Sequence, residues 1–358
     1  MVRTGYPLLF TLCALACTAV PAQAAPDAAP VRLLGEQVLP HGLDVQGTTA
    51  GGLSGIDYSA RTGEYVLISD DRSAKNPARF YTARIPVDGN GVGPVAFTAT
   101  HPFRTPDGGT YPADSVDPED IRVDPWTGDY VWTQEGERAG PVLSDPSVRI
   151  THPDGTFAGE LPIPDNERLR PDSGPRRNET LEGASFAAGG ALLVSSVEGP
   201  LLQDGPDATA AAGALTRLTV QGRVGPPLAQ YAYPLDPVHA EGSGSTGVAA
   251  VLAADPADPA RYLVLERSYV EGVGNRIRIY EADTSGATNV LDAPLGQARP
   301  AGKRLLVDLA DVGLSHIDNV EGMTWGPRLS SGERTLVLVS DDNFSDRQIT
   351  QLIALAVR

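Results

Sequence analysis

The chain has 358 residues, of which 41% are hydrophobic, and its formal net charge is −17. This composition is typical of a globular domain with a sizeable core. The acidic excess argues against nucleic acid as a partner, because the phosphate backbone binds basic surfaces.

Residues 1–24 have the pattern of a secretory signal peptide. Arg3 precedes an apolar segment at 7–20, and Ala22-Gln23-Ala24 forms a small-residue cleavage site. The segment is too short to span a bilayer, so we expect no integral membrane segment. A lipoprotein linked through Cys17 is the weaker alternative, because a leucine lies adjacent to the small residue before this cysteine rather than three positions before it. We therefore expect a secreted or periplasmic protein.

The mature chain is expected to be one domain without cysteine chemistry. Both cysteines, Cys13 and Cys17, lie in the predicted signal peptide. Residues 25–30 form a Pro/Ala linker, and residues 31–358 form a single domain. Its stability must then come from the core or from bound ions rather than from disulfides.

Five similar hairpins follow one another along this domain. Each has a polar residue at the start of an apolar strand, and a second strand that ends in acidic residues, as in Tyr65–Asp71 and Thr335–Asp342. The hairpins recur at intervals of about 63 to 75 residues, which is typical of repeat arrays and propellers. Their first strands begin at Ser54, Glu119, Glu182, Thr246 and Glu321.

These repeats predict an all-β fold, a β-propeller with five blades. Four strands are expected in each of the first four repeats, whereas the fifth is one strand short. The N-terminal strand at 31–39 would supply the missing strand and close the ring, which removes an open sheet edge. Six blades are the alternative if residues 283–301 hide a further sheet, and a β-sandwich array is a more distant one.

The predicted ring brings acidic residues together at one mouth of the central channel. The five starting residues would surround this mouth, and the second strands would add Asp70/Asp71, Glu135, Glu198, Glu266 and Asp341/Asp342. Carboxylates this close raise one another's pKa unless a cation compensates them. The five histidines form no close-spaced ligand pair, so calcium suits the site better than zinc. We expect Glu119, Glu182 and Glu321 to hold the metal.

Arginines accompany these acids in the sequence. Arg72, Arg267 and Arg347 follow acidic residues and, with Asn343, are predicted to bind an anionic substrate. Asp71, Glu198 and Asp342 are predicted as the catalytic residues that position water. The alternative is structural: the carboxylates cap strand ends and the arginines form salt bridges with them. A Gly-x-Ser-x-Gly motif and a cysteine nucleophile are both absent from the mature sequence, which disfavours a serine- or cysteine-hydrolase mechanism.

Several motifs together resemble a known family. They are Gly52-Leu53-Ser54-Gly55-Ile56-Asp57, Ile68-Ser69-Asp70-Asp71-Arg72, Asp117-Pro118-Glu119-Asp120-Ile121, Asn178-Glu179-Thr180-Leu181-Glu182-Gly183, Val264-Leu265-Glu266-Arg267 and Asn319-Val320-Glu321-Gly322-Met323. In order and spacing they are similar to the secreted phytase-like family labelled "esterase-like activity of phytase". The resemblance implies a propeller, export, and hydrolysis of phosphoesters or esters.

We therefore expect a monomeric, calcium-dependent hydrolase of a small anionic or ester substrate. A binding propeller without turnover is one alternative. A calcium-dependent lactonase is another, in which Asn178, Asn319 and Asn343 would matter.

Overall fold

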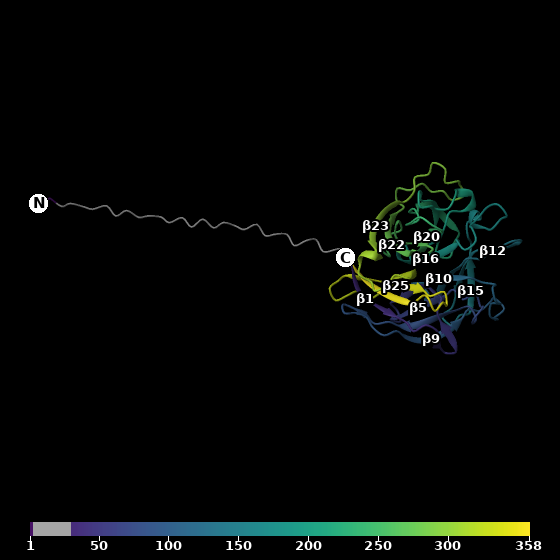
Figure 1. Ribbon diagram of the computed structural model, residues 1–358, viewed down its shortest axis with the longest axis horizontal. Helices are drawn as coiled ribbons and strands as arrows, with labels where there is room; N and C mark the ends of the chain where they lie inside the picture. Colours follow the sequence, from purple (N-terminus) through teal and green to yellow (C-terminus); the bar gives the residue numbers. More distant parts are fainter. Residues whose placement is uncertain (3–29) are drawn as a thin grey trace.

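The computed structural model describes residues 1–2 and 30–358, and the predicted signal peptide and linker lie outside the described residues apart from their ends. The described chain is all-β. Its main elements are five four-stranded antiparallel sheets, which form the blades of a five-bladed propeller (Figure 1). The predicted fold class is thereby confirmed.

Each of the first four blades consists of strands taken in chain order from the axis outward. Blade 1 contains β4 (Leu53–Ser59), β5 (Glu64–Ser69), β6 (Arg79–Arg84) and β9 (Ala96–Pro102). Blade 2 contains β10 (Pro118–Val123), β11 (Tyr130–Gln134), β14 (Ser147–Thr151) and β15 (Phe157–Leu161). Blade 3 contains β16 (Leu181–Ala187), β17 (Leu192–Val197), β18 (Leu215–Gly222) and β19 (Pro227–Pro234). Blade 4 contains β20 (Gly244–Ala253), β21 (Arg261–Val270), β22 (Gly274–Asp283) and β23 (Gly302–Asp308).

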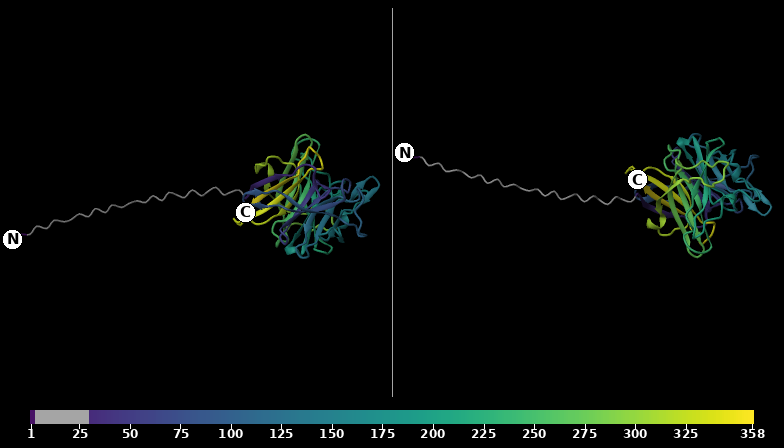
Figure 2. Two further views of the ribbon diagram at one scale, coloured as in Figure 1. Left: turned by 90° about the horizontal axis from the view of Figure 1, so that it is seen from below. Right: turned by 90° about the horizontal axis from the view of Figure 1, so that it is seen from above.

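Blade 5 joins the two ends of the described chain, as the sequence predicts. Its strands are β24 (Asn319–Trp325), β25 (Arg334–Asp341), β26 (Gln351–Val357) and the N-terminal β1 (Val31–Val38). β1 pairs antiparallel with β26, from Val31 opposite Val357 to Val38 opposite Gln351. Figure 2 shows these first and last strands, purple and yellow, side by side. The pairing closes the ring and leaves β26 without a free edge.

The first strand of each blade lies at the axis. β4 contacts β10 and β24, β16 contacts β10 and β20, and β20 contacts β24, so the five inner strands surround one channel. The hydrophobic core fills the spaces between neighbouring sheets. Between blades 4 and 5, for example, Leu265 and Ile279 belong to one buried cluster with Met323, Leu338 and Leu355. Strands buried on both faces explain the nearly continuous apolar runs in the sequence.

The connections between these strands add only small elements. They are the hairpins β2 (Leu43–Val45) with β3 (Thr48–Ala50), β7 (Val87–Asp88) with β8 (Gly91–Val92) and β12 (Glu137–Ala139) with β13 (Val142–Ser144), and the 3-10 turns η1 (Asp165–Glu167), η2 (Ala188–Gly190), η3 (Leu202–Asp204) and η4 (Leu309–Asp311). Between β22 and β23 the described chain contains no strand, so the six-bladed alternative does not apply. Within residues 1–2 and 30–358, no helix is long and apolar enough to cross a membrane.

Candidate active site at an acidic mouth

A β-bulge interrupts the first strand of every blade at the corresponding place. In blade 3, Leu181 pairs with Val197 and Gly183 with Ser196, which leaves Glu182 unpaired between them. A bulge re-aims the side chain of the unpaired residue. The residues at this position in blades 1 to 5 are Ser54, Glu119, Glu182, Ala249 and Glu321, and in blade 2 the irregularity also includes Asp120.

The second strand of every blade passes beside the bulge and adds a second row. In blade 5 Asn319 pairs with Asp341, and in blade 2 the amide of Glu135 donates to the carbonyl of Asp117. The corresponding residues of blades 1 to 5 are Asp70, Glu135, Glu198, Arg267 and Asp341.

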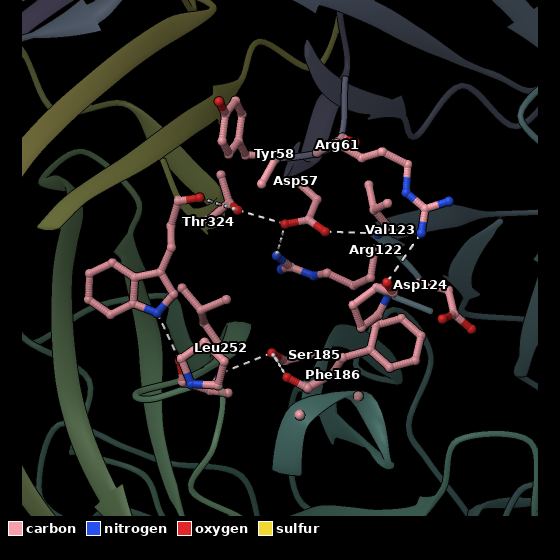
Figure 3. A pocket seen from close by; sticks show the side chains of 18 residues that line it. Asp57, Tyr58, Arg61, Arg122, Val123, Asp124, Ser185, Phe186, Leu252 and Thr324 are labelled. Atoms are coloured by element: carbon pink, nitrogen blue, oxygen red, sulfur yellow. Dashed lines mark hydrogen bonds and ion pairs between the residues drawn. The ribbon is translucent and has the colours of Figure 1, made fainter. Parts of the chain in front are cut away.

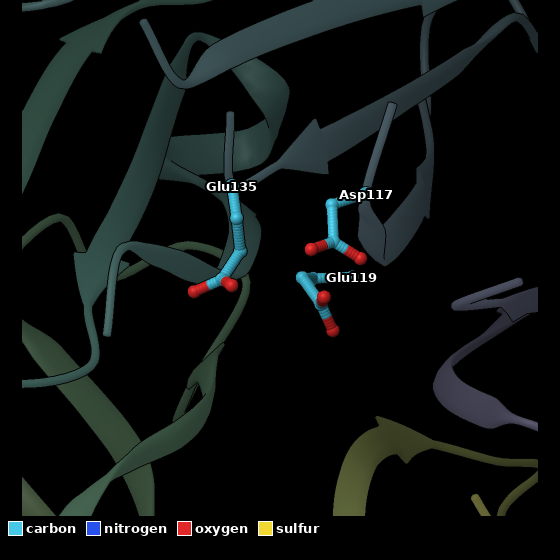
Figure 4. Close-up of side chains that lie close together, drawn as sticks. All are labelled: Asp117, Glu119 and Glu135. Atoms are coloured by element: carbon cyan, nitrogen blue, oxygen red, sulfur yellow. The ribbon is translucent and has the colours of Figure 1, made fainter. Parts of the chain in front are cut away.

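Side chains of both rows line a cavity of about 740 Å³ at one end of the channel. We call this cavity the acidic mouth. Figure 4 shows Asp117, Glu119 and Glu135 converging there from neighbouring positions of blade 2. One carboxylate oxygen from each of these three residues lies within 4.8 Å of the others, and the same holds for Glu135, Glu182 and Glu198. Two overlapping sets of oxygen ligands that share Glu135 therefore lie at the mouth: Asp117, Glu119 and Glu182 line the cavity itself, whereas Glu135 and Glu198 lie just outside its lining.

Few groups of the protein compensate these charges. The carboxylates of Glu119 and Glu182 accept no hydrogen bond from any residue in the described part of the chain, and only 8% of Glu182 is exposed. Burial, reinforced by the charge of Glu182, raises the pKa of Glu119 well above its usual value. Burial and the charge of Glu198 likewise raise the pKa of Glu182, and they raise the pKa of Glu135 to about 8. Carboxylates in this arrangement favour partial protonation or a bound cation.

Arg267 occupies the place that an acid takes in the other blades. Its guanidinium lies 3.0 Å from a carboxylate oxygen of Glu198 and 3.6 Å from one of Glu321. The surrounding carboxylates raise the pKa of Arg267, although burial opposes this effect. Arg267 therefore partly neutralises the carboxylates of blades 3 and 5, and within the described residues it forms no ion pair with the carboxylates of blade 2.

Blade 4 departs from the predicted ring. The sequence placed Thr246 and Glu266 at the mouth, but the bulge falls at Ala249 and the second row at Arg267. Thr246 instead donates a hydrogen bond to Ser268. Glu266 accepts one from Tyr233 and forms an ion pair with Lys303. The ring of acids is thus incomplete, because blade 4 contributes an alanine and an arginine.

Of the two Asp-Asp pairs, the first member of each lines the mouth. Asp70 and Asp341 lie in its wall, whereas the predicted catalytic residues Asp71 and Asp342 do not. The carboxylate of Asp71 accepts hydrogen bonds from three successive backbone amides, those of Ala74 to Asn76, and forms an ion pair with Arg79.

The carboxylate of Asp342 accepts hydrogen bonds from the backbone amides of Gly52 and Phe344. Successive residues of a strand point to opposite sides, so only one aspartate of each pair can face the channel. Glu198, the third predicted catalytic residue, lies in the second row and is held by Arg267.

The predicted substrate-binding residues lie around the same cavity. Arg72, Arg267, Arg347 and Asn343 all line it. Arg72 is engaged by Glu137 at 2.6 Å and by Asp117 at 3.5 Å. Arg347 is exposed at the rim, and we find no ion pair for it within residues 30–358. The predicted metal residues Glu119, Glu182 and Glu321 also line the cavity, so the structure brings the proposed metal and anion groups together.

Sequence reasoning missed two residues near the mouth. Asp117 belongs to the first set of oxygen ligands, and burial raises its pKa to about 6. It stands two residues before Glu119, which is a spacing that places both side chains on one side of a strand. Asp120 is directed along the channel and binds Arg122 at 2.7 Å.

Arg122 closes the channel below the mouth. Its side chain starts on blade 2 and donates to the carbonyl of Ile56 in blade 1 and to that of Met323 in blade 5. Arg122 is 1% exposed and Asp120 is 3% exposed. This buried ion pair separates the acidic mouth from the opposite end of the propeller.

Comparisons with known proteins agree with this architecture. The model of the phytase-like family, described as "Esterase-like activity of phytase", matches residues 48–344. A search of curated proteins finds no match. Among solved structures, an N-acetylgalactosamine deacetylase from F. plautii, in complex with blood group B trisaccharide, is similar with a TM-score of 0.50 and 12% identity, over 91% of this chain and 95% of that chain. A gluconolactonase from Xanthomonas campestris has a TM-score of 0.33 and 12% identity, over 94% and 99%. At 12% identity the likeness to the deacetylase concerns the fold alone.

Proposed function

The chain belongs to the phytase-like family described as "Esterase-like activity of phytase", and we propose that it is an exported hydrolase of phosphoesters or small esters that requires a divalent cation. The observation that carries this proposal is the acidic mouth. Its carboxylates are crowded and buried, and two of them accept no hydrogen bond from the described residues.

The ligands of the mouth fit a hard cation. Every group in the two sets, Asp117, Glu119 and Glu135 with Glu182 and Glu198, offers carboxylate oxygen. Calcium accepts many oxygen ligands in flexible geometry, whereas zinc favours nitrogen and sulfur. We therefore assign calcium to the side of the mouth that Arg267 leaves uncompensated. A divalent cation, when bound, supplies Lewis-acid activation of a phosphoryl or carbonyl oxygen.

The arginines of the rim suit an anionic substrate. Arg347 is exposed beside Asn343, and both line the cavity. A guanidinium can contact two oxygens of a phosphate or carboxylate at once. Arg267 is engaged by Glu198 and Glu321, so we assign to it the task of holding these carboxylates in place. Substrate orientation then rests on Arg347 and Asn343, with Arg72, which pairs with Glu137 and Asp117, lining the same cavity.

Asp70 replaces Asp71 as our candidate for the general base. Asp70 lines the cavity, and burial together with the charge of Asp341 raises its pKa well above the usual value. A raised pKa suits a group that accepts a proton from water near neutral pH. Asp71 is occupied by backbone amides and Arg79, which suits a structural role.

The decisive experiment compares metal-free and calcium-loaded protein. The full mature chain is stripped with chelator and assayed with 4-nitrophenyl phosphate, phytate, 4-nitrophenyl acetate and a simple lactone, with and without calcium. We expect calcium-dependent hydrolysis of a phosphoester or ester, and its loss in Glu119→Gln and Glu182→Gln. The matched control is Glu241→Gln, since Glu241 is exposed.

Three results would contradict this proposal or change its substrate. Calcium binding without turnover of any substrate would favour the binding propeller, and turnover of the lactone alone would favour the lactonase. Hydrolysis that is indifferent to chelator and to both substitutions would end the metal-dependent mechanism. Export is tested separately by expression with residues 1–24 intact and N-terminal sequencing of the protein outside the cytoplasm.

A further inference from the structure

A second cavity, of about 420 Å³, lies at the end of the propeller opposite the acidic mouth. We call it the lower pocket. Its floor contains one residue from the first strand of each blade, three positions after the bulge. These residues are Asp57, Arg122, Ser185, Leu252 and Thr324. A strand rises about 3.3 Å per residue, so this ring lies roughly 10 Å from the bulge residues along the axis.

The walls of the lower pocket are largely apolar and well supported. Tyr58, Phe186 and Trp325 line it together with Leu252. The indole of Trp325 donates to the carbonyl of Ala253 at 2.8 Å. The guanidinium of Arg334 lies 3.4 Å from the centre of the same ring. The pocket is therefore held in shape by contacts of its own walls. Its size and lining are those of a small-molecule site.

Asp57 is the carboxylate of the floor, and it retains free hydrogen-bonding capacity. Figure 3 shows its carboxylate joined to Thr324, Val123 and Arg122. One oxygen accepts the hydroxyl of Thr324 at 2.7 Å, and the other accepts the amide of Val123 at 2.8 Å. A carboxylate offers about four acceptor positions, so each oxygen has room for one more donor. Arg122 uses four of its five N–H groups on Asp120, Ile56 and Met323.

The formal charges around the lower pocket balance. Arg122 is paired with Asp120 at 2.7 Å, and Asp124 with Arg223 at 2.5 Å. Asp57 and Arg61 complete the balance with opposite signs, and Asp57 also lies 3.8 Å from Nη1 of Arg122. Arg61 donates to backbone carbonyls of residues 125–127 rather than to a carboxylate. A charged ligand would meet no net counter-charge here, and it would lose its hydration on entering an apolar pocket.

We propose that the lower pocket binds an uncharged cyclic molecule with an apolar body and a hydroxyl or N–H group that donates to Asp57. The ring packs between Tyr58, Phe186 and Trp325, and the donor takes a free acceptor position of Asp57. This site is separate from the acidic mouth because Arg122 and Asp120 close the channel between them. It therefore does not depend on the proposed hydrolase activity.

The test is a calorimetric titration of the full mature chain in chelator with three matched probes. 1-Naphthol has the donor, 1-methoxynaphthalene lacks it, and 1-naphthoate is charged. We expect saturable binding of 1-naphthol, and about tenfold or more weaker binding of the other two, because a hydrogen bond to a charged acceptor is lost or a charge is desolvated. Equal binding of 1-methoxynaphthalene would overturn the role of Asp57, and tighter binding of 1-naphthoate would overturn the preference for an uncharged ligand.

Two substitutions locate the site. Leu252→Trp fills the floor, and Ala60→Trp fills the entrance from an exposed position that leaves the core intact. Both should abolish 1-naphthol binding, whereas Val142→Trp, at an exposed position on β13, should not. If the Leu252→Trp variant does not fold, the Ala60→Trp variant alone tests whether 1-naphthol binds in the lower pocket. Binding that survives in Ala60→Trp, or the absence of saturable binding to the wild type, would overturn the proposal. Retention of the calcium response in these variants would show that the acidic mouth is intact.

Discussion

The guanidinium of Arg79 lies 2.7 Å from the carboxylate of Asp71, and neither side chain is exposed by more than 1%. Asp70, which directly precedes Asp71 in the sequence, lines the acidic mouth. Two adjacent aspartates therefore have different tasks.

Asp71→Asn should lower the free energy of unfolding by about 3–5 kcal/mol, because it leaves the buried guanidinium of Arg79 without its counter-charge. Asp70→Asn should abolish hydrolysis and leave stability unchanged or higher, because it removes a repelling carboxylate. Urea unfolding and the 4-nitrophenyl assays distinguish these effects. Loss of activity in a fully stable Asp71→Asn variant would reverse the assignment.

Glu119→Gln should stabilise the metal-free protein and abolish its response to calcium. A cation that binds only the folded state adds about 2.7 kcal/mol at a hundredfold excess over Kd, which corresponds to a rise in Tm of several degrees. Thermal melts in calcium and in chelator test both effects. Glu241→Gln should behave like the wild type. A wild-type Tm that is the same in calcium and in chelator would rule out the metal site.

Arg267→Gln should destabilise the metal-free protein and enlarge the shift in Tm that calcium produces. The substitution removes the positive charge that Glu198 and Glu321 face, so repulsion rises and a cation is bound more strongly. Arg168→Gln is the control, since its ion pair with Asp145 is largely exposed and contributes little. A smaller calcium shift in Arg267→Gln would show that Arg267 supports the metal site rather than replacing a cation.

Stability should fall between pH 4.5 and 7 because of Glu167, which lies in the turn η1 and is bonded by residues of blade 3. This carboxyl is fully buried, and one of its oxygens has no partner among the described residues. Burial raises its pKa from 4.5 to about 7. The folded state therefore binds a proton that the unfolded state releases in this window, so stability decreases as pH rises through it and is level above it.

Glu167→Gln keeps the bonds from Thr219 and Gln230 to one oxygen and cannot ionise. It should be more stable than the wild type at pH 8 by an amount on the order of 3 kcal/mol, and by little at pH 4.5. Urea unfolding at both pH values measures the difference. Glu160→Gln, at a half-exposed site, should show no such change. An unchanged difference between the two pH values would contradict the titration of Glu167.

Deletion of residues 31–38 should open the ring. β26 would lose its partner β1, and its free edge could pair with another chain. We expect loss of cooperative unfolding and the appearance of large species in size-exclusion chromatography. Truncation of residues 1–30 is the control and should leave a single cooperative transition. A soluble monomer with an unchanged melt after deletion of 31–38 would contradict the role of β1 in closure.

The blade pattern was predictable because apolar strands and acidic strand ends recur at regular intervals. The register of blade 4 was not, because the sequence comparison aligned Gly247 with Gly183. In the structure the neighbouring strand β20 packs closely against Gly183, and a Cβ added to Gly183 would lie 2.6 Å from the amide nitrogen of Val251. Blade 4 has Ala250 at the corresponding position. The glycine is thus required by contact with the neighbouring blade and not by the bulge itself. Glu266 was assigned to the mouth for the same reason, whereas Arg267 occupies that position in the structure.

The lower pocket had no signal in the sequence. Its floor residues Asp57, Arg122, Ser185, Leu252 and Thr324 share neither charge nor size, so no pattern connects them until the five inner strands are superposed. The acidic mouth was easier to recognise because its residues resemble one another.

The ion pair of Arg122 with Asp120 determines how substrate and product can enter and leave the acidic mouth. With the axis blocked, the acidic mouth is a dead end, and whatever enters it must depart by the same opening. The leaving fragments of a reaction therefore obstruct the arrival of the next molecule, and accumulated product should slow turnover by occupying the entrance. Any control exerted from the lower pocket would therefore act through the protein, by way of the buried pair that spans the axis.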